Sequence, residues 1–283
     1  MVSVQEKINS LPSLRLTVEA HGLLAKKALG QNFLLDRNIT DKIVRLSLEH
    51  QGLADFAGAN VFEVGPGPGG LTRAVMSANP QSLTVAEMDE RCVAIMQDIQ
   101  RLAPEKMEII CGDALKIDFK DLRPAPRHVI SNLPYNVSVP LLVGWLKDMA
   151  SYQSLTLMFQ KEVADRIMAP IKTKDYGRIS ILSQLQCKIE RLTDLPPECF
   201  VPAPKIWSSV LLFRPQEKLL TAEQIDKIEK LTNTVFAQRR KMIRQSLKFV
   251  SGLEEKLAQV GILPTQRPEE ITPQQFLQLA EVL

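Results

Sequence analysis

The sequence has few cysteines, no long apolar run and little excess charge. It holds four cysteines in 283 residues, none spaced as a Cys-x-x-Cys pair. A disulfide framework or a metal site is therefore not expected, and free thiols in a reducing compartment are the better interpretation. No apolar run approaches the roughly 20 residues that a membrane-spanning helix needs. The net charge of +3 permits an anionic partner without requiring one, so the distribution of charge matters more than its sum.

The first twenty residues lack the features of a targeting segment. They contain Arg15, Glu6 and Glu19 but no hydrophobic core flanked by lysines. That composition resembles neither a secretory signal nor a transit peptide, so we expect a cytoplasmic protein. The three histidines are scattered along the chain, and we assign them no chemistry.

Short apolar runs alternate with helical patterns through most of the chain, which predicts an α/β fold with a doubly wound, mostly parallel sheet. A short helix is expected over residues 14–27, a loop over 30–36 and an amphipathic helix after it. The expected strands are residues 61–64, 82–86, 107–111, 128–131, 154–160 and a strand around 179–189.

After residue 215 the pattern changes to helical periodicity interrupted by proline and glycine, which predicts a smaller all-helical C-terminal domain. We therefore divide the chain into an N-terminal extension and helix (1–30), a catalytic domain (31–215) and a helical domain (216–283).

A glycine-rich loop, Glu-Val-Gly-Pro-Gly-Pro-Gly-Gly at 63–70, follows the first expected strand and opens a helix. Glycines allow a tight turn and close approach of the backbone to a ligand. The two prolines and the acid at position 63 argue against a dinucleotide fingerprint, and so against a nicotinamide-dependent oxidoreductase. A plain strand-to-helix turn is the competing interpretation.

Two acids follow the next two expected strands. Glu87 ends the second, where a carboxylate can accept hydrogen bonds from the ribose hydroxyls of an adenosine ligand. Asp113 lies just past the third, where it can accept from an adenine amino group. Because the carboxyl ends of parallel strands meet at one edge of a sheet, we expect both acids beside the glycine loop. Either acid alone could instead cap a helix.

The run Asn132-Leu133-Pro134-Tyr135 follows the fourth expected strand. Aromatic amines are poor nucleophiles, and hydrogen-bond acceptors placed against the amino hydrogens favour a pyramidal, reactive nitrogen. The Asn132 amide oxygen and the Leu133 carbonyl are suitable acceptors. Pro134 has no N–H to compete and stiffens the turn. Tyr135 offers a ring that can stack on an unstacked base. A strand-to-helix turn with a buried tyrosine remains the alternative.

These motifs, in this order, resemble the bacterial small-subunit (KsgA-type) ribosomal RNA adenine N6,N6-dimethyltransferase family. The resemblance extends from about residue 26 to 250 and includes the segments 29–36, 63–70, 87–89, 112–114, 132–136, 160–166, 200–205 and 239–241. It implies a Rossmann-like methyltransferase fold with S-adenosylmethionine as the methyl donor. It also implies transfer of two methyl groups to each of two adjacent adenines near the 3′ end of small-subunit (16S) rRNA, late in ribosome assembly.

The resemblance also implies roles for individual residues. Asn32 and Leu34 would contact the donor from the N-terminal loop, Gly65 would pass close to its methionine moiety, and Asn132 would lie between donor and target. Glu87 would hold the donor ribose and Asp113 its adenine. Tyr135 would stack on the target base, with Phe200 as a second face. Together the implied catalytic residues are Asn132, Leu133, Pro134, Tyr135 and Phe200.

One residue departs from the family pattern. After Lys205 the family has a small apolar residue, a polar or acidic residue and then serine, whereas this chain has Ile206, Trp207 and Ser208. We expect the indole to pack within a strand pair, with contact to RNA as the alternative.

A basic run without acids lies within residues 231–250. Placed on one helix, Arg240, Arg244 and Lys248 would share a face at i, i+4 and i+8. Such a face suits contact with RNA phosphates, and a solvated helix surface is the alternative. The expected RNA-binding residues are Arg239, Arg240, Lys241, Arg244 and Lys248.

The expected partner is the small ribosomal subunit, with no membrane contact and no need for a dimer. Three other functions stay open at this point: a related enzyme acting on large-subunit rRNA or another nucleic acid, a non-catalytic ribosome-assembly or transcription factor that kept the fold, and an oxidoreductase.

Overall fold

The computed structural model describes residues 3–23 and 32–283, and the chain forms two compact units. The first unit comprises Met1–Leu142, Ala150–Lys161 and Glu190–Arg214, and the second comprises Val143–Met149, Glu162–Ile189 and Pro215–Leu283. The second unit thus draws segments from inside the range 31–215. The division into 1–30, 31–215 and 216–283 assigns functions to parts of the chain and stays a prediction. The two compact units instead show which segments pack together.

The sheet has seven strands in the order β4-β3-β2-β5-β6-β9-β7. The neighbours from β4 to β6 are parallel, and β9 is antiparallel to β6. The expected doubly wound, mostly parallel sheet is confirmed. The strands are β2 Asn60–Val64, β3 Ser82–Glu87, β4 Met107–Cys111, β5 Arg127–Asn132, β6 Ser154–Gln160, β7 Cys187–Leu195 and β9 Ser208–Pro215.

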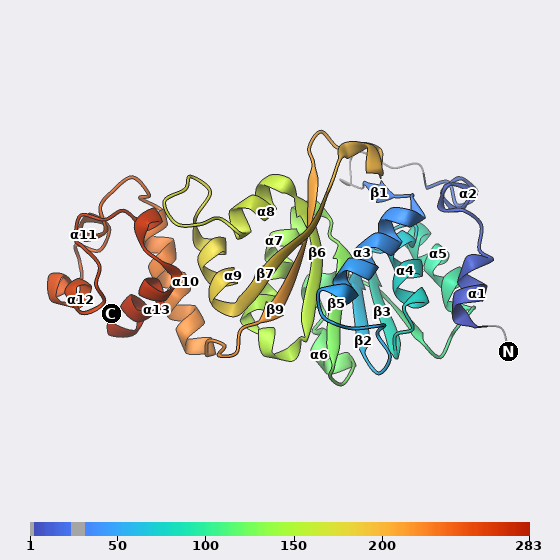
Figure 1. Ribbon diagram of the computed structural model, residues 1–283, viewed down its shortest axis with the longest axis horizontal. Helices are drawn as coiled ribbons and strands as arrows, with labels where there is room; N and C mark the ends of the chain where they lie inside the picture. The colour runs from blue at the N-terminus through green and yellow to red at the C-terminus, as the bar shows by residue number, and fades with distance from the viewer. Residues whose placement is uncertain (1–2, 24–31) are drawn as a thin grey trace. The chain divides into compact units, whose positions relative to one another are not determined.

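Helices cover both faces of the first unit's sheet (Figure 1). Successive side chains along β2 point to opposite faces of the sheet. Val61 belongs to the hydrophobic core on one face. The ring of Phe62 packs on the other face against Phe119 of α6, with 4.8 Å between the ring centroids. Pairs of elements in contact include α1 with α4 and α3 with α4. The helices are α1 Val4–Asn9, α2 Leu14–Ala20, α3 Arg37–Glu49, α4 Gly70–Ser77, α5 Glu90–Gln100, α6 Phe119–Leu122 and α7 Tyr135–Lys147.

The segment before the sheet is packed onto the first unit. Ile8 is buried, and the guanidinium of Arg73 on α4 donates to the carbonyl of Pro12 (2.6 Å) and to the hydroxyl of Thr17 (3.1 Å). The helix expected over 14–27 ends at Ala20 in α2, and its last four positions lie outside the described residues. The loop expected over 30–36 contains a short strand, β1 Phe33–Leu34, which pairs with β8 Phe200–Val201.

The strand expected around residues 179–189 is wrong. Helix α9 Arg178–Gln186 occupies most of this range, and β7 begins only at Cys187. The helix buries Ser180 and Ser183 as well as Ile181 and Leu182, so it has no polar face to reveal a helical period. The Ser180 hydroxyl accepts from the N–H of Gly177, which begins the helix, and donates to the Arg166 carbonyl.

The second unit is built on α9, α10 Ala222–Phe236 and α13 Pro273–Val282, which contact one another. Its core gathers Tyr176, Val235 and Phe276, and the Tyr176 hydroxyl donates to the Ile271 carbonyl at 2.9 Å. The shorter helices are α8 Lys161–Ile167, α11 Ile243–Ser246 and α12 Leu253–Gln259. Among residues 3–23 and 32–283, no helix has the length and apolar character needed to cross a membrane.

Candidate active site

The glycine loop connects the end of β2 to the start of α4 and forms the floor of the site. Gly65 has a φ of +65°, a conformation that side-chain-bearing residues rarely adopt. A Cβ atom at this position would also lie 3.2 Å from the Pro134 ring. The positive φ therefore favours glycine here, and the close approach of the Pro134 ring adds to that preference.

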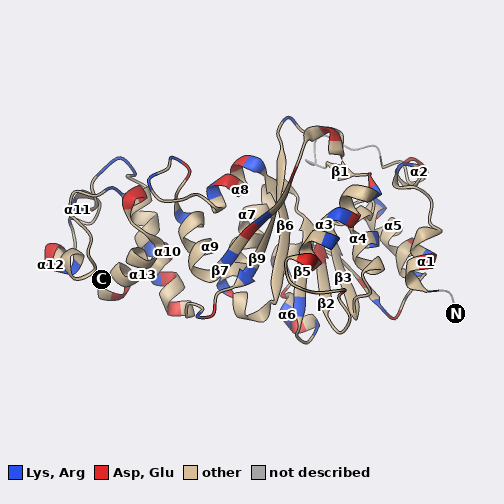
Figure 2. Ribbon diagram, in the orientation of Figure 1, with Lys and Arg blue, Asp and Glu red and all other residues tan. Residues whose placement is uncertain are grey.

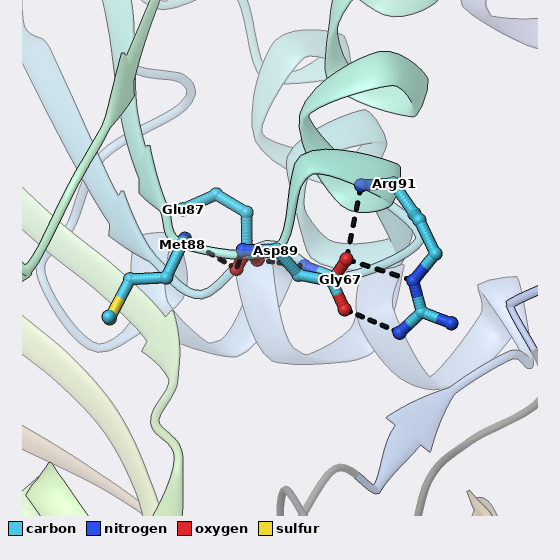
Figure 3. A network of polar contacts seen from close by, with 5 residues as sticks. All are labelled: Gly67, Glu87, Met88, Asp89 and Arg91. Carbon is cyan, nitrogen blue, oxygen red and sulfur yellow. Dashed lines mark hydrogen bonds and ion pairs between the residues drawn. The ribbon is translucent and has the colours of Figure 1, made fainter.

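Glu87 ends β3 and is held in place by backbone N–H groups (Figure 3). Its Oε1 accepts from the N–H groups of Met88 (2.8 Å) and Asp89 (2.9 Å), and its Oε2 accepts from that of Gly67 (3.3 Å). Burial raises the pKa of the Glu87 carboxyl, and these hydrogen bonds oppose the rise. Asp89, beside it, caps α5 through the Arg91 N–H and also pairs with the Arg91 guanidinium.

A second carboxyl, Glu63, lies under the loop and is fully buried. The Thr72 hydroxyl donates to its Oε2 at 2.7 Å. Burial raises the pKa of Glu63 to about 8, with a smaller contribution from the charge of Glu87. Near neutral pH this group is therefore largely protonated, which keeps a second negative charge away from Glu87.

The strand end of β5 brings Asn132 to the site, and α7 begins directly after it at Tyr135. The Asn132 amide nitrogen donates to the backbone carbonyl of Asn32 at 3.4 Å. The Tyr135 hydroxyl shares a hydrogen bond of 3.0 Å with the hydroxyl of Ser208, at the start of β9. Burial raises the pKa of the Tyr135 hydroxyl by more than the hydrogen bond with Ser208 lowers it, so the phenol stays neutral.

Two pockets meet over the glycine loop. A small one of about 90 Å³ lies among the loop, β1 and the start of α7. A larger one of about 690 Å³ extends along the ends of β3 and β4, a size that suits a small-molecule ligand. Both are lined by Gly65, Glu87 and Pro134, so the two pockets adjoin one another. Within the described part of the chain, no cluster of His, Cys, Asp or Glu could hold a metal ion.

The structure brings most of the expected residues to these two pockets. Asp113 lines the larger pocket, where its carboxylate also accepts from the N–H of Leu115 and so caps a short helical turn, Ala114–Lys116. The smaller pocket is lined by the other expected residues: Asn32, Leu34, Gly65, Glu87, Asn132, Leu133, Pro134 and Tyr135. Residues 29–31 of the resembling segment 29–36 lie outside the described residues.

Phe200 is not brought to the pocket. Its side chain is 2% exposed, it belongs to the hydrophobic core and it pairs with Leu34 across the β1–β8 ladder. In this conformation its ring supports the strand that carries Leu34 and offers no face to a base.

The single basic helix is also wrong. Helix α10 ends at Phe236, so Arg240 lies in the turn that follows, and α11 spans only Ile243–Ser246. Arg240, Arg244 and Lys248 therefore do not share one helix face. Met242, which precedes α11, adopts an extended conformation, so α11 does not continue α10. Figure 2 shows lysine and arginine in the segment between α10 and α11.

The five basic residues differ in their contacts. Arg239 donates to the Thr173 carbonyl at 2.9 Å and lies 3.9 Å from Glu269, so it connects segments of the second unit. The other four are exposed, and within residues 3–23 and 32–283 none has an ion pair: Arg240, Lys241, Arg244 and Lys248.

Sequence reasoning missed three residues at the site. Met88 and Leu115 are 69% and 50% exposed and form apolar walls of the larger pocket. Their positions, directly after Glu87 and two residues after Asp113, could have indicated them. Ser208, by contrast, contacts Tyr135 from 73 residues away, and no local sequence pattern predicts this contact. The expected packing of Trp207 is wrong as well, because its side chain is 48% exposed.

Comparisons with known proteins show which family this chain is similar to. The ribosomal RNA adenine dimethylase family matches residues 22–283. Ribosomal RNA small subunit methyltransferase A of Rhodospirillum rubrum is 43% identical over 283 residues, covering 100% of this chain and 96% of that protein. The protein of the same name from Agrobacterium fabrum is 45% identical over 281 residues, covering 98% and 99%.

Two crystal structures share the fold. A dimethyladenosine transferase from Plasmodium falciparum gives a TM-score of 0.69 at 21% identity, covering 86% of this chain and 94% of that one. The 23S rRNA methyltransferase ErmE gives 0.66 at 23% identity, covering 88% and 98%.

Proposed function

This chain belongs to the ribosomal RNA adenine dimethylase family, and we propose that it methylates small-subunit rRNA. It transfers methyl groups from S-adenosylmethionine to the N6 amino groups of two adjacent adenines near the 3′ end of 16S rRNA, giving N6,N6-dimethyladenosines during ribosome assembly. It acts in the cytoplasm as a monomer. The observation that carries the proposal is the orientation of the Asn132 amide beside the pocket that Glu87 and Gly65 line.

The residues at the two pockets fit the donor. A carboxylate has about four lone-pair sites, and Glu87 uses three of them on backbone N–H groups, the contact to Gly67 being the longest at 3.3 Å. Its Oε2 therefore keeps acceptor capacity for the ribose hydroxyls. Asp113 lines the larger pocket and would accept from the donor adenine amino group, and Met88 and Leu115 would provide apolar walls for the ring. Gly65, Asn32 and Leu34 line the smaller pocket and would hold the methionine moiety.

When bound, the donor supplies an electrophilic methyl group attached to a sulfonium sulfur. The rest of the donor is released as a neutral thioether when the methyl group is transferred. The protein prepares the amine. Because the Asn132 Nδ2 group donates to the Asn32 carbonyl, the amide oxygen is left as the acceptor for an amino hydrogen of adenine. The Leu133 carbonyl supplies a second acceptor, and Pro134 adds no competing N–H. The amine loses its proton to solvent after the N–C bond forms, so no general base is needed.

Tyr135 holds the target base by stacking. Its hydroxyl is fixed by Ser208, which locks the ring at the start of α7 in one orientation. A ring held in this way costs little conformational entropy when an adenine is extruded from the RNA and stacks on it. Phe200 is buried in this conformation and does not serve as the opposite face without a rearrangement of the β1–β8 ladder.

Phosphate contacts come from the second unit. Four exposed cations there, Arg240, Lys241, Arg244 and Lys248, supply the sequence-independent part of RNA binding. Arg239 instead supports the packing of that unit through Thr173.

The test is transfer of a radiolabelled methyl group from S-adenosylmethionine to small ribosomal subunits from a strain that lacks this modification, followed by nucleoside analysis. Labelled N6,N6-dimethyladenosine is the expected product, and large subunits serve as the control. Label only in large subunits would assign the chain to another RNA. Donor binding without transfer to either subunit would identify it as a non-catalytic assembly factor.

A further inference from the structure

Trp207 is an exposed indole close to the catalytic pocket. Of the two tryptophans in the chain, Trp145 is 6% exposed and Trp207 is 48% exposed. A half-exposed tryptophan is unusual because its large apolar surface is normally buried or covers a binding site. Ile206, on the connection between β8 and β9, and Val201, which ends β8, are also exposed, at 37% and 45%. The connection thus presents an apolar surface to solvent.

The backbone of Trp207 is held in place, whereas its side chain is half-exposed. Its carbonyl accepts from the N–H of Lys161 at 2.8 Å, where β6 ends. The next residue, Ser208, pairs with Gln160 in the antiparallel β6–β9 ladder, and its hydroxyl contacts Tyr135. The indole is therefore one residue away from the group that positions the proposed target-stacking ring. An aromatic side chain on a rigid backbone is well suited to stacking.

The charges around this indole favour an anionic partner. Lys205, two residues before it, is exposed and has no ion pair within the described part of the chain. Lys161, whose N–H holds the Trp207 carbonyl, lies 3.9 Å from Asp194, and Asp194 is also within 3.6 Å of Arg191. The two cations near Asp194 outnumber that single acid. An aromatic ring beside an exposed lysine is a combination that binds single-stranded nucleic acid.

We propose that Trp207 stacks on an unpaired base of the RNA substrate, at a nucleotide next to the target adenine. The inference builds on the proposed function, since it assumes that RNA enters at the pocket of Asn132 and Tyr135. Tyr135 holds the target base, and Trp207 holds its neighbour so that the strand is splayed across the mouth of the pocket. Lys205 contacts the phosphate that joins the two. The stacking of Trp207 makes the chain prefer unpaired RNA at the position beside the target.

The two tryptophans allow a direct spectroscopic test. Trp145→Phe leaves Trp207 as the single reporter, and Trp207→Phe leaves the buried Trp145 as the control. The probe is a protein-free RNA hairpin carrying two adjacent adenines in its loop, since ribosomal proteins would add their own tryptophan emission. Stacking should quench the emission of the Trp145→Phe protein on titration with this RNA and leave that of the Trp207→Phe protein unchanged. RNA binding seen by gel mobility without quenching of Trp207 would overturn the proposal.

Binding measurements supply the second readout. Trp207→Ala should weaken binding of the hairpin about tenfold, and Trp207→Phe should recover most of the affinity because a ring is kept. The affinity for S-adenosylmethionine should not change in either variant. Leu16→Ala, at an apolar side chain on α2 that is 57% exposed, is the matched control and should bind RNA like the unaltered protein. Equal RNA affinity of Trp207→Ala and the unaltered protein would refute the stacking role.

The two proposals fail in different ways. If the unaltered protein methylates small subunits while Trp207→Ala shows neither weaker RNA binding nor lost quenching, only the role of Trp207 is wrong. If the unaltered protein neither binds the hairpin nor methylates any subunit, the proposed function is wrong and the stacking role falls with it.

Discussion

The amide nitrogen of Asn132 donates to the backbone carbonyl of Asn32, 3.4 Å away and 100 residues earlier in the chain. This contact decides which end of the amide faces the pocket. A free asparagine could present either its nitrogen or its oxygen, but only the oxygen can accept from an amine. The segment before the sheet therefore orients a side chain at the end of β5, and under the proposed mechanism it would contribute to the chemistry in this way.

Asn132→Ala should retain donor binding and lose most turnover. The substitution removes an acceptor that acts on the amino group as the nitrogen becomes pyramidal, and loss of one such polar contact costs about 10²- to 10³-fold in kcat. Single-turnover methylation of small subunits measures the rate, and calorimetric titration measures the donor affinity. A kcat equal to that of the unaltered protein would remove Asn132 from the mechanism. Asn132→Asp tests the orientation separately, because it keeps an acceptor but cannot donate to Asn32.

Ser208→Ala should slow methyl transfer by loosening the ring of Tyr135. The two hydroxyls share one hydrogen bond of 3.0 Å, so Ser208→Ala and Tyr135→Phe remove the same interaction. Each should reduce kcat/KM roughly threefold to tenfold, as expected for one hydrogen bond. The double variant should be no worse than either single one, because the effects of one shared contact do not add. Additive losses in this cycle would show that Ser208 acts independently of Tyr135.

Glu63→Gln should change how stability depends on pH. The folded protein holds the Glu63 proton up to a pKa of about 8, whereas the unfolded chain releases it near the ordinary value of 4.5. Between these values ionisation favours the unfolded chain, so the free energy of unfolding falls as pH rises from 4.5 to 8, by up to roughly 4 kcal/mol. The Glu63→Gln protein has no group at this position that ionises, so it should lack this decline. Urea denaturation at pH 5 and pH 8, without donor, measures the difference. An equal decline in both proteins would show that Glu63 is ionised in the folded state.

The strand ends could be predicted because each one depends on local pattern. An apolar run followed by a glycine, acid or asparagine identified the ends of β2, β3 and β5, and the parallel arrangement then placed Gly65, Glu87 and Asn132 at one edge. The α9 helix could not be recognised in this way, because both its polar and its apolar residues are buried and its sequence therefore shows no helical periodicity. The break after Phe236 was missed for a similar reason: a basic, acid-free run carries no sign of where a helix ends.

Contacts between distant segments lay beyond the sequence patterns. Ser208 holds Tyr135, Asn32 orients Asn132, and β8 buries Phe200 against the core. Each of these depends on which strands become neighbours. The exposure of Trp207 belongs to the same class, since an indole beside a strand is packed in most proteins and only the fold shows that this one is not.

The break in the basic region changes what its residues are expected to do. Arg239 is engaged by the Thr173 carbonyl, so its removal should weaken the packing of the second unit more than RNA binding. Arg240, Arg244 and Lys248 are exposed, and they can contact phosphates without sharing a helix face. Charge loss at these three positions therefore isolates the electrostatic part of binding.

Replacing Arg240, Arg244 and Lys248 together by Ala should weaken binding to small subunits and flatten its salt dependence. Each cation that neutralises a phosphate adds about 0.7–0.9 to the slope of log K against log salt, so the slope should fall by about 2 in magnitude. Lys218, Lys227 and Lys230 are exposed in the same unit, and replacing these three by Ala removes the same charge as a control. Filter binding over a range of potassium chloride concentrations measures both slopes. If the control variant loses as much slope as the triple variant, net charge and not this segment determines the affinity for the subunit.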